Sequence, residues 1–411
     1  VNIVVQVRLM PTPEVASALE CTLRTANDAA NWLSGLAYER GETSRRALQG
    51  LAYVDLKTRG LSAQPALHVL RKVADAYTAL RANIRNGNLG KPGSKRRGRA
   101  EGRPISFRAD AAQPYDDRCL SWQVDERTVS IWTTAGRLQG VRFACSEQAR
   151  NLLAERRRGE SDLVYRDGMW FLIATCEVPE AELYEPVDFL GVDLGIVNIA
   201  TTSDGKIHAG RGLNRYRKRQ LVLRAKLQKK GTKSAKRVLK RQRRKEQRKA
   251  TEVNHIISKR IVTEAERTGR GIGMEDLAGI RTRVRLRKPQ RVTLHSWAFA
   301  QLGRFVEYKA RRAGVPVLFV DPAYTSRICA ECAYTDKLNR VSRGRFVCRS
   351  CGFVDHADRN GSRNIRARAW RLWRSGAESH APAPVQGAGW RGLPNSQLGS
   401  TSKPGPSEPG S

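Results

Sequence analysis

The chain has 411 residues and a formal net charge of +36, because 75 Lys and Arg residues outnumber 39 Asp and Glu residues. Such a basic chain is expected to bind polyanions, with nucleic acid as the default and a membrane surface as the lesser alternative. The sequence contains no apolar run of roughly 18 residues or more, and Val1–Val5 is not part of a charged leader with a long apolar segment. We therefore expect neither a transmembrane helix nor a signal peptide.

The N-terminal segment predicts one strand followed by a small helical bundle. Asn2–Met10 alternates as a strand does, and Thr12-Pro13 is typical of a helix start. Helices are predicted at Pro13–Glu39, Ser44–Thr58 and Ser62–Asn86. The glycine-rich basic segment Asn86–Arg99 is interpreted either as a loop that contacts phosphates or as a solvated linker.

Between residues 105 and 178 the pattern changes to short strands. Strands are predicted at Ile105–Arg108, Leu120–Val124, Val129–Thr133, Leu138–Phe143, Asp162–Arg166 and Met169–Cys176, with a helix at Ser146–Arg157. Antiparallel strands at this spacing predict a small β-barrel. The strand Asn2–Met10 can join it, which makes the helical bundle an insertion. An acidic linker, Pro179–Val187, follows.

The run Phe189–Ile196 predicts a buried strand that carries one carboxylate, Asp193. The strand is predicted to continue through Thr202, before a hairpin turn at Asp204-Gly205. A buried carboxylate is costly unless it is paired or binds a metal. Asp193 is therefore either a metal ligand, as in RNase H-like nucleases, or a sheet residue satisfied by the backbone or by a distant Arg.

The segment Arg215–Lys249 concentrates the positive charge, with 18 Lys or Arg residues and one acid, Glu246. It predicts a helical hairpin broken at Gly231, followed by a separate helix at Val253–Arg267. A run of like charges is often only a solvated face. Here, however, almost no acids compensate the charge, so the cationic side chains repel one another, and a bound polyanion would relieve this repulsion. We expect nucleic-acid contact here.

The C-terminal part predicts further short strands and helices around two groups of candidate ligands. Gly271–Leu277 is a short apolar strand that ends in acid, and Pro316–Val320 is a second buried strand. The remaining segments are predicted as a basic loop at Arg281–Arg291, helices at Ser296–Arg312 and Asn360–Trp373, and a disordered or ligand-binding tail from Ser375.

Four of the eight cysteines form two C-x2-C pairs separated by fifteen residues, which suits a reducing compartment. The four are Cys329, Cys332, Cys348 and Cys351. Four thiolates at this spacing predict one tetrahedral, structural Zn²⁺ site in a ribbon, with free thiols or disulfides as the alternatives. The other four cysteines are interpreted as ordinary core thiols.

Three carboxylates form the second group: Asp193, Glu275 and Asp358 lie on predicted strands or at a helix start. Hydrolysis of a phosphodiester by two Mg²⁺ ions needs hard oxygen ligands that hold the ions roughly 3.5–4 Å apart. Each acid alone could be structural. The three together, beside a cysteine cluster in a basic chain, predict a metal-dependent catalytic site.

The motifs Gly191–Gly195, Met274–Leu277, Tyr324–Ser326 and His356–Asn360 resemble TnpB, the transposon-encoded RNA-guided nuclease, and its kin the compact type V CRISPR effectors. The last of these motifs ends in Asn364-Ile365, and weaker matches are Arg8-Leu9-x-Pro11, Asn27 and Asn31-Trp32. The resemblance assigns Asp193, Glu275 and Asp358 as Mg²⁺ ligands of a RuvC-like nuclease domain. The sequence departs from the family at Ala333, where Gly is frequent, and at Gly361-Ser362, where Ala-Ala is usual.

The resemblance implies an α+β multidomain fold: an RNase H-like (RuvC) domain with an inserted zinc ribbon, and a wedge β-barrel interrupted by a helical recognition bundle. The implied ranges are 1–10 and 101–186 for the wedge, 11–100 for recognition, 187–322 and 357–374 for the nuclease domain, 323–356 for the ribbon and 375–411 for the tail. It also implies a prokaryotic cytoplasmic enzyme with guide RNA and target DNA as partners. The alternatives are a guide-free junction resolvase and a non-cleaving nucleic-acid-binding protein.

Overall fold

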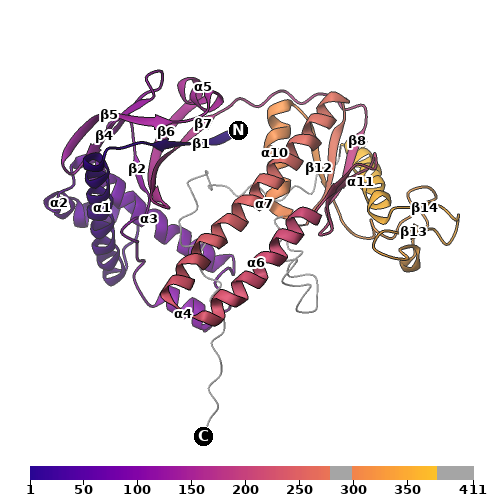
Figure 1. Cartoon of the computed structure of the whole chain (residues 1–411), viewed down its shortest axis with the longest axis horizontal. Coiled ribbons are helices and arrows are strands. Elements are labelled where there is room, and N and C mark those ends of the chain that lie inside the picture. The colour runs from indigo at the N-terminus through magenta and orange to yellow at the C-terminus, as the bar shows by residue number, and fades with distance from the viewer. Residues whose placement is uncertain (278–298, 377–411) are drawn as a thin grey trace, which may run out of the picture. The chain divides into compact units, whose positions relative to one another are not determined.

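The computed structural model describes residues 1–277 and 299–376. The described chain forms two compact units, one comprising Asn2–Val178 and the other beginning at Pro179 (Figure 1). The predicted basic loop at Arg281–Arg291 and nearly all of the predicted tail lie outside the described residues. Within the described ranges, every helix is too short or too polar to cross a bilayer.

The unit Asn2–Val178 contains a seven-stranded sheet in the order β2-β6-β7-β1-β5-β4-β3. Its strands are β1 (Asn2–Leu9), β2 (Gln113–Tyr115), β3 (Leu120–Gln123), β4 (Thr128–Thr133), β5 (Gly136–Ala144), β6 (Arg157–Arg166) and β7 (Met169–Glu177), with helix α5 (Glu147–Arg156) between β5 and β6. As predicted, β1 joins this sheet, between β5 and β7. In the described residues, the strands predicted to form a β-barrel form one sheet, and β2 and β3 are its two edge strands.

The predicted strand Ile105–Arg108 is wrong, because this segment pairs with a side chain rather than with a strand. The Asn31 amide donates to the carbonyl of Phe107 at 2.9 Å, and its oxygen accepts from the Phe107 N–H at 2.7 Å. The neighbouring Asn27 donates to the carbonyls of Ala109 and Ala111. Two amide side chains therefore satisfy an extended backbone that alternation alone would place in a sheet.

The helical insertion lies between β1 and β2, as predicted. It consists of α1 (Pro13–Arg40), α2 (Arg45–Thr58), α3 (Ala63–Arg85) and the short α4 (Lys95–Glu101). Leu33, Leu48 and Val69 are fully buried in the core shared by the first three helices. Helix α4 occupies the end of the segment that was predicted as a loop, because the Ser94 hydroxyl caps it by accepting from the Arg97 N–H.

The unit from Pro179 contains a five-stranded sheet in the order β10-β9-β8-β11-β12. The strands are β8 (Phe189–Asp193), β9 (Asn198–Thr202), β10 (Ile207–Ala209), β11 (Gly271–Glu275) and β12 (Val317–Val320). β8, β11 and β12 are parallel neighbours, whereas β9 and β10 run antiparallel. The prediction of one strand through Thr202 is corrected: the chain reverses after Asp193, where the Gly195 N–H donates to the Ile199 carbonyl.

Helices cover both faces of this sheet. On one face, Leu190 and Val192 of β8 pack with residues of α7 (Lys233–Arg267) and α10 (Phe299–Ala313). On the other face, Phe189 packs with Ile365 and Ala369 of α11 (Ala357–Arg374). Because side chains alternate along a strand, residues 189, 191 and 193 face α11.

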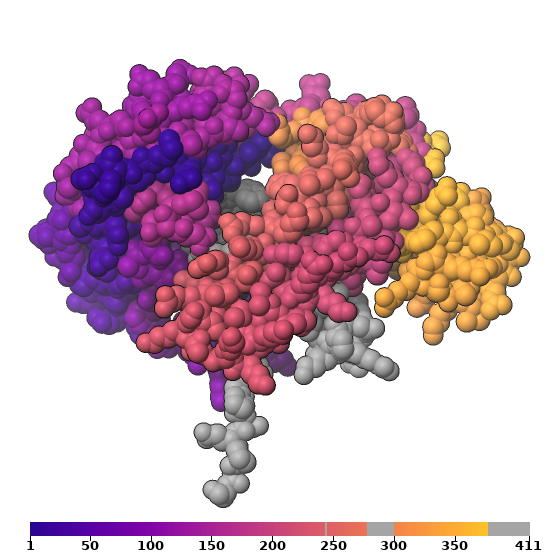
Figure 2. Space-filling view, viewed as in Figure 1, coloured from indigo at the N-terminus to yellow at the C-terminus, as the bar shows by residue number. Residues whose placement is uncertain are grey.

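The basic segment forms a helical hairpin, as predicted, but its second helix is longer than expected. Helix α6 (Arg211–Lys230) ends at Gly231, and α7 then runs without a break for 35 residues. The predicted separate helix at Val253–Arg267 is the C-terminal part of α7, which is buried at Ile257 and Ile261. Figure 2 shows α6 and α7 side by side at the surface of their unit.

Candidate metal and nucleic-acid site

The strand register brings two of the three predicted carboxylates together. Met274 of β11 lies opposite Val192 of β8, and the two strands run parallel. Asp193 and Glu275 therefore follow at the same carboxyl end of adjacent strands, both directed to the α11 face by the alternation of side chains. The carboxyl ends of parallel strands are where ligands bind in open α/β sheets.

Two glycines let α11 approach this edge of the sheet closely. A Cβ on Gly191 would lie 1.9 Å from the Ser362 carbonyl, so no other residue fits there. A Cβ on Gly361 would lie 3.3 Å from Oδ2 of Asp193. Asp358 stands in the first turn of α11, and its charge acts on Asp193. The departure Gly361-Ser362 is thus compatible with close packing, and the structure places the three predicted carboxylates at one locus.

Neutral and cationic side chains hold Glu275 and Asp358 in place. The Thr325 hydroxyl donates to Oε1 of Glu275 at 2.5 Å. Asp358 accepts from the Asn198 amide at 2.9 Å and from the Arg340 guanidinium at 3.2 Å. The sequence motifs already contained Thr325, but Asn198 and Arg340 were missed, because only the folded chain shows which distant residues reach a carboxylate.

The carboxylates repel one another in a poorly solvated place. Burial, with the nearby charges of Glu275 and Asp358, raises the pKa of Asp193 to about 8. Burial also raises the pKa of Glu275, against the hydrogen bond from Thr325. Clustered carboxylates with raised pKa values are typical of functional sites, since a bound cation removes both the repulsion and the desolvation cost.

The four predicted cysteines form a tight cluster. In the part of the chain that the structure describes, they are the single group of three or more potential ligands whose atoms all lie within 4.8 Å of one another. Sγ of Cys329 lies 3.8 Å from that of Cys351, and Sγ of Cys332 lies 3.6 Å from that of Cys348. Thiolates around a tetrahedral Zn²⁺, at 2.3 Å each, stand about 3.8 Å apart. The donor set therefore fits zinc.

The carboxylate oxygens are more widely spread than the sulfur atoms, since they form no group within the same limit. Their fit to Mg²⁺ rests on other properties. They are hard oxygen donors, as Mg²⁺ prefers. The Asp358 side chain also remains partly accessible, with 17% of its surface exposed.

Asparagines of α11 tie the cysteine-bearing segment to this helix. The Asn360 amide donates to the Ile328 carbonyl at 2.8 Å, and its oxygen accepts from the Ala330 N–H at 3.0 Å. Asn364 donates to the carbonyls of Thr325 and Ile328. Both asparagines belong to the motifs found in the sequence, and the structure gives their role: they fix the first cysteine pair beside the carboxylates.

The backbone explains why glycine is the expected residue at one position where this sequence departs from the pattern. Ala333, directly after Cys332, has φ +61°, in the left-handed region that favours glycine. Glycine is frequent at this position in the resembled family, and the turn of the cysteine pair is the physical reason. Tyr324, one residue before Thr325, has φ +63° and is 59% exposed.

Helices α6 and α7 present a strongly cationic surface. Their one acid between residues 215 and 249, Glu246, pairs with Arg224 at 2.7 Å and lies 4.0 Å from Arg217. One carboxylate cannot balance 18 cationic residues. The excess positive charge predicted from the sequence therefore lies on an exposed helical hairpin, which suits contact with phosphates.

Comparisons with known proteins agree with these observations. Residues 174–278 match the family model described as a probable transposase, OrfB of IS605, and residues 299–365 match the TNB domain of Cas12f1-like proteins. The chain is 42% identical over 113 residues to the CRISPR-associated endodeoxyribonuclease Cas12f1 of Sulfoacidibacillus thermotolerans, covering 27% of this chain and 25% of that protein. It is 29% identical over 221 residues to the putative RNA-guided DNA endonuclease InsQ of Escherichia coli K12, covering 49% of this chain and 54% of that protein.

The aligned regions thus span about a quarter to about half of the length of these curated relatives. A solved structure of the mini-RNA-guided endonuclease CRISPR-Cas_phi3 shares the fold, with a TM-score of 0.53 and 11% identity, over 93% of this chain and 94% of that one. The two family models together include Asp193, Glu275, Asp358 and the four clustered cysteines. The resemblance to TnpB and to the compact type V CRISPR effectors is therefore confirmed.

Proposed function

We propose that the chain is an RNA-guided DNA endonuclease that hydrolyses phosphodiester bonds at a single RuvC-like site. The observation that carries the proposal is the convergence of Asp193, Glu275 and Asp358 at the edge where β8, β11 and α11 meet. The names of the relatives, endodeoxyribonuclease and RNA-guided DNA endonuclease, support the same activity.

In this proposal the three carboxylates hold Mg²⁺. Bound Mg²⁺ supplies Lewis-acid polarisation of the phosphate and an activated water. The chain itself contributes orientation: Thr325 fixes Glu275, while Asn198 and Arg340 fix Asp358. The Arg340 guanidinium can also donate a hydrogen bond to a phosphate oxygen. Such a donor stabilises the negative charge that develops on the scissile phosphate in the transition state.

The cysteine cluster holds Zn²⁺ as a structural ion, because all four ligand positions are filled by sulfur. Its task is to keep the segment from Tyr324 to Asp355 folded against α11, and with it Thr325 and Arg340. We assign residues 323–356 as a zinc ribbon that binds target nucleic acid, residues 187–322 and 357–374 as the nuclease domain, and residues 1–186 as the wedge and recognition domains.

The guide RNA and the target DNA are the proposed partners. The exposed hairpin of α6 and α7 supplies phosphate contacts without reading sequence, which suits recognition by base pairing. The test is to purify the protein expressed with its native locus, treat it with DNase, and sequence the RNA that remains. A discrete RNA that is partly variable or matches adjacent DNA supports the proposal. Heterogeneous RNA, together with guide-free cutting of branched DNA, contradicts it.

A further inference from the structure

The turn that follows β12 brings an aromatic residue to the edge of the carboxylate site. In the parallel pair of β11 and β12, Glu275 lies opposite Val320, so the chain leaves the sheet beside this carboxylate. The chain then returns to it at Thr325, whose hydroxyl donates to Oε1 of Glu275 at 2.5 Å. Tyr324 directly precedes Thr325, and consecutive Cα atoms are about 3.8 Å apart. The Tyr324 backbone is therefore held at the rim of the proposed cleavage site.

Hydrogen bonds fix this turn in a strained conformation. The Tyr324 carbonyl accepts from the Arg327 N–H at 2.8 Å and from the Ile328 N–H at 3.0 Å. The Asn364 amide donates to the Thr325 carbonyl at 2.9 Å. Tyr324 has φ +63°, a left-handed conformation that costs free energy for a residue with a Cβ and that glycine adopts readily. The backbone of this turn would therefore favour glycine over tyrosine.

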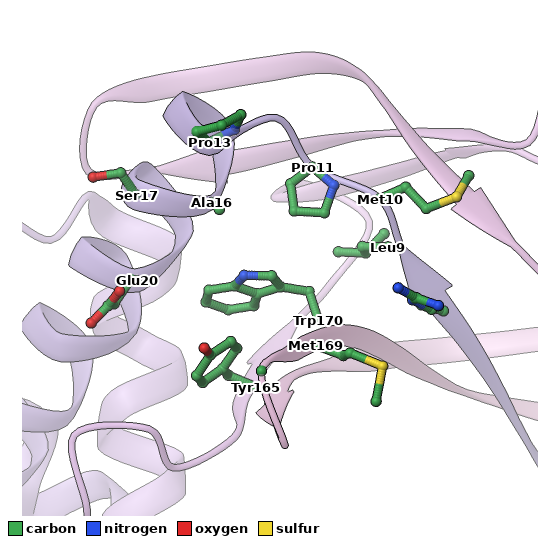
Figure 3. A pocket seen from close by; sticks show the side chains of 12 residues that line it. Leu9, Met10, Pro11, Pro13, Ala16, Ser17, Glu20, Tyr165, Met169 and Trp170 are labelled. Carbon is green, nitrogen blue, oxygen red and sulfur yellow. The ribbon is translucent and has the colours of Figure 1, made fainter.

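Packing does not explain the tyrosine either, because its ring lies largely in solvent. Tyr324 is 59% exposed. Trp170 is the opposite case: it is 5% exposed, and Figure 3 shows its indole between the rings of Tyr165 and Pro11. The faces of that indole are covered, whereas much of the Tyr324 ring remains available to a ligand. Strained residues of this kind cluster at functional sites.

Cationic groups lie beside the exposed ring. The Arg327 guanidinium is 5.8 Å from the centroid of the Tyr324 ring, and within the described ranges no carboxylate pairs with it. Arg368 is anchored to the turn by a hydrogen bond to the Asp321 carbonyl at 2.6 Å. Burial raises the pKa of Glu275, and the Arg368 charge counters this rise. An aromatic face next to guanidinium groups is the combination that binds a base and its phosphates.

We propose that Tyr324 stacks on one base of the DNA strand that is cut, next to the scissile phosphate, while Arg327 contacts a neighbouring phosphate. Tyr324 is then a substrate-binding residue, which determines the phosphate that meets the carboxylates. A base inside a duplex is already stacked on both faces, so the strand at the site is locally single-stranded. The inference rests on the proposed nuclease function and adds a specific residue and substrate geometry to it.

Fluorescence measures the stack without cleavage. A short single-stranded DNA that carries one 2-aminopurine is titrated with the purified full chain, with Ca²⁺ in place of Mg²⁺ so that the strand is bound but not cut. We expect the wild type and Tyr324→Phe to quench the fluorescence with equal affinity. Tyr324→Ala should bind about tenfold more weakly, the effect expected when one stacked base is lost. Tyr38→Ala, at an exposed tyrosine of the other unit, is the matched control and should behave as the wild type.

The salt dependence separates the stack from the charge. For a single strand, each phosphate contact contributes about 0.7 to the slope of log affinity against log salt concentration. Arg327→Ala should lower the slope by about this amount. Tyr324→Ala should weaken binding at every salt concentration and leave the slope unchanged, because stacking releases no counterions.

Cleavage in Mg²⁺ tests whether the stack positions the cut. Abasic sites replace, one at a time, the bases beside the scissile phosphate. At one position the wild type should lose about tenfold in kcat/KM. Tyr324→Ala, already slower by about the same factor, should cut the intact and the abasic strand equally, because both changes remove one interaction. Tyr324→Gly should be as slow as Tyr324→Ala without melting earlier than the wild type, since glycine relieves the backbone strain.

The proposal is overturned if Tyr324→Ala quenches with wild-type affinity, or if the abasic site slows Tyr324→Ala as much as it slows the wild type. Inactive wild-type protein whose quenching still depends on Tyr324 refutes the nuclease proposal alone. Active protein that is indifferent to Tyr324→Ala in both binding and cleavage refutes only the stacking proposal.

Discussion

The guanidinium of Arg340 lies 3.2 Å from Oδ1 of Asp358, so that the cysteine-bearing segment contributes a cation directly to the carboxylate site. Arg340 stands between the two cysteine pairs, whereas Asp358 belongs to α11. The ion pair therefore joins the two groups of candidate ligands found in the sequence. It also means that the folding of the cysteine cluster and the geometry of the carboxylates are linked.

Replacement of Arg340 tests this link. Arg340→Ala should reduce the rate of DNA cleavage about 10–100-fold, because a donor that orients a ligand and faces the reacting phosphate is lost. Zinc content and RNA binding should not change. The control is Arg345→Ala, at an exposed position of the same segment. Equal cleavage rates for Arg340→Ala and the control would show that the ion pair has no role in the reaction.

The cysteine cluster predicts one zinc ion per chain, measurable by atomic emission on the purified protein. Cys348→Ser should lower both the zinc content and the melting temperature, because the binding energy of a structural metal is folding energy. Cys21→Ser, at an exposed cysteine outside the cluster, is the matched control and should change neither. A fully active, stable protein without zinc would refute the assignment.

The left-handed backbone at Ala333 predicts a stabilising substitution. Ala333→Gly should raise the free energy of unfolding of the zinc-loaded protein by about 1 kcal/mol, since a Cβ in this conformation is strained. Ala330→Gly serves as the control, because Ala330 is not among the residues with positive φ and should lose stability on substitution. Denaturant titration measures both effects, and loss of stability in Ala333→Gly would contradict the explanation.

Lys72 on α3 predicts a pH dependence in the N-terminal unit. Burial lowers the pKa of Lys72 to about 7, although its ammonium donates to Asn27 and to the Ala112 carbonyl. Between pH 7 and the ordinary lysine pKa of about 10.4, the unfolded chain therefore binds more protons than the folded one. The free energy of unfolding should rise with pH over this interval, and the penalty is fully present below pH 7.

Lys72→Met should flatten that rise, whereas the exposed Lys95→Met should preserve it. The measurement is denaturant unfolding of the full chain at several pH values from 7 to 9. If the two variants show the same slope with pH, the buried ammonium is not its source.

Local patterns in the sequence were sufficient where they reflect short-range physics. The cysteine spacing predicted the observed cluster, and the apolar run ending in acid placed Glu275 at a strand end. The errors came from long-range partners. Side-chain amides replaced the sheet at residues 105–108, and nothing in the run up to Thr202 revealed the reversal after Asp193.

The polar neighbours of the carboxylates illustrate the same limit. Asn198 and Arg340 are separated from Asp358 by 160 and 18 positions, and an isolated Asn or Arg carries no local pattern. Only the packing of α11 on β8, made possible by Gly191, brings these residues together.

The most direct test of the central claim is programmable cleavage at the carboxylate site. The purified complex receives a guide whose variable part is exchanged for a new sequence, and is incubated with Mg²⁺ and DNA containing the matching or the original target. We predict cutting that follows the new guide and is lost in Asp193→Asn, Glu275→Gln and Asp358→Asn, while Asp276→Asn stays active and all variants still bind RNA. Cutting that ignores the guide, or that persists in Asp193→Asn, would contradict the account.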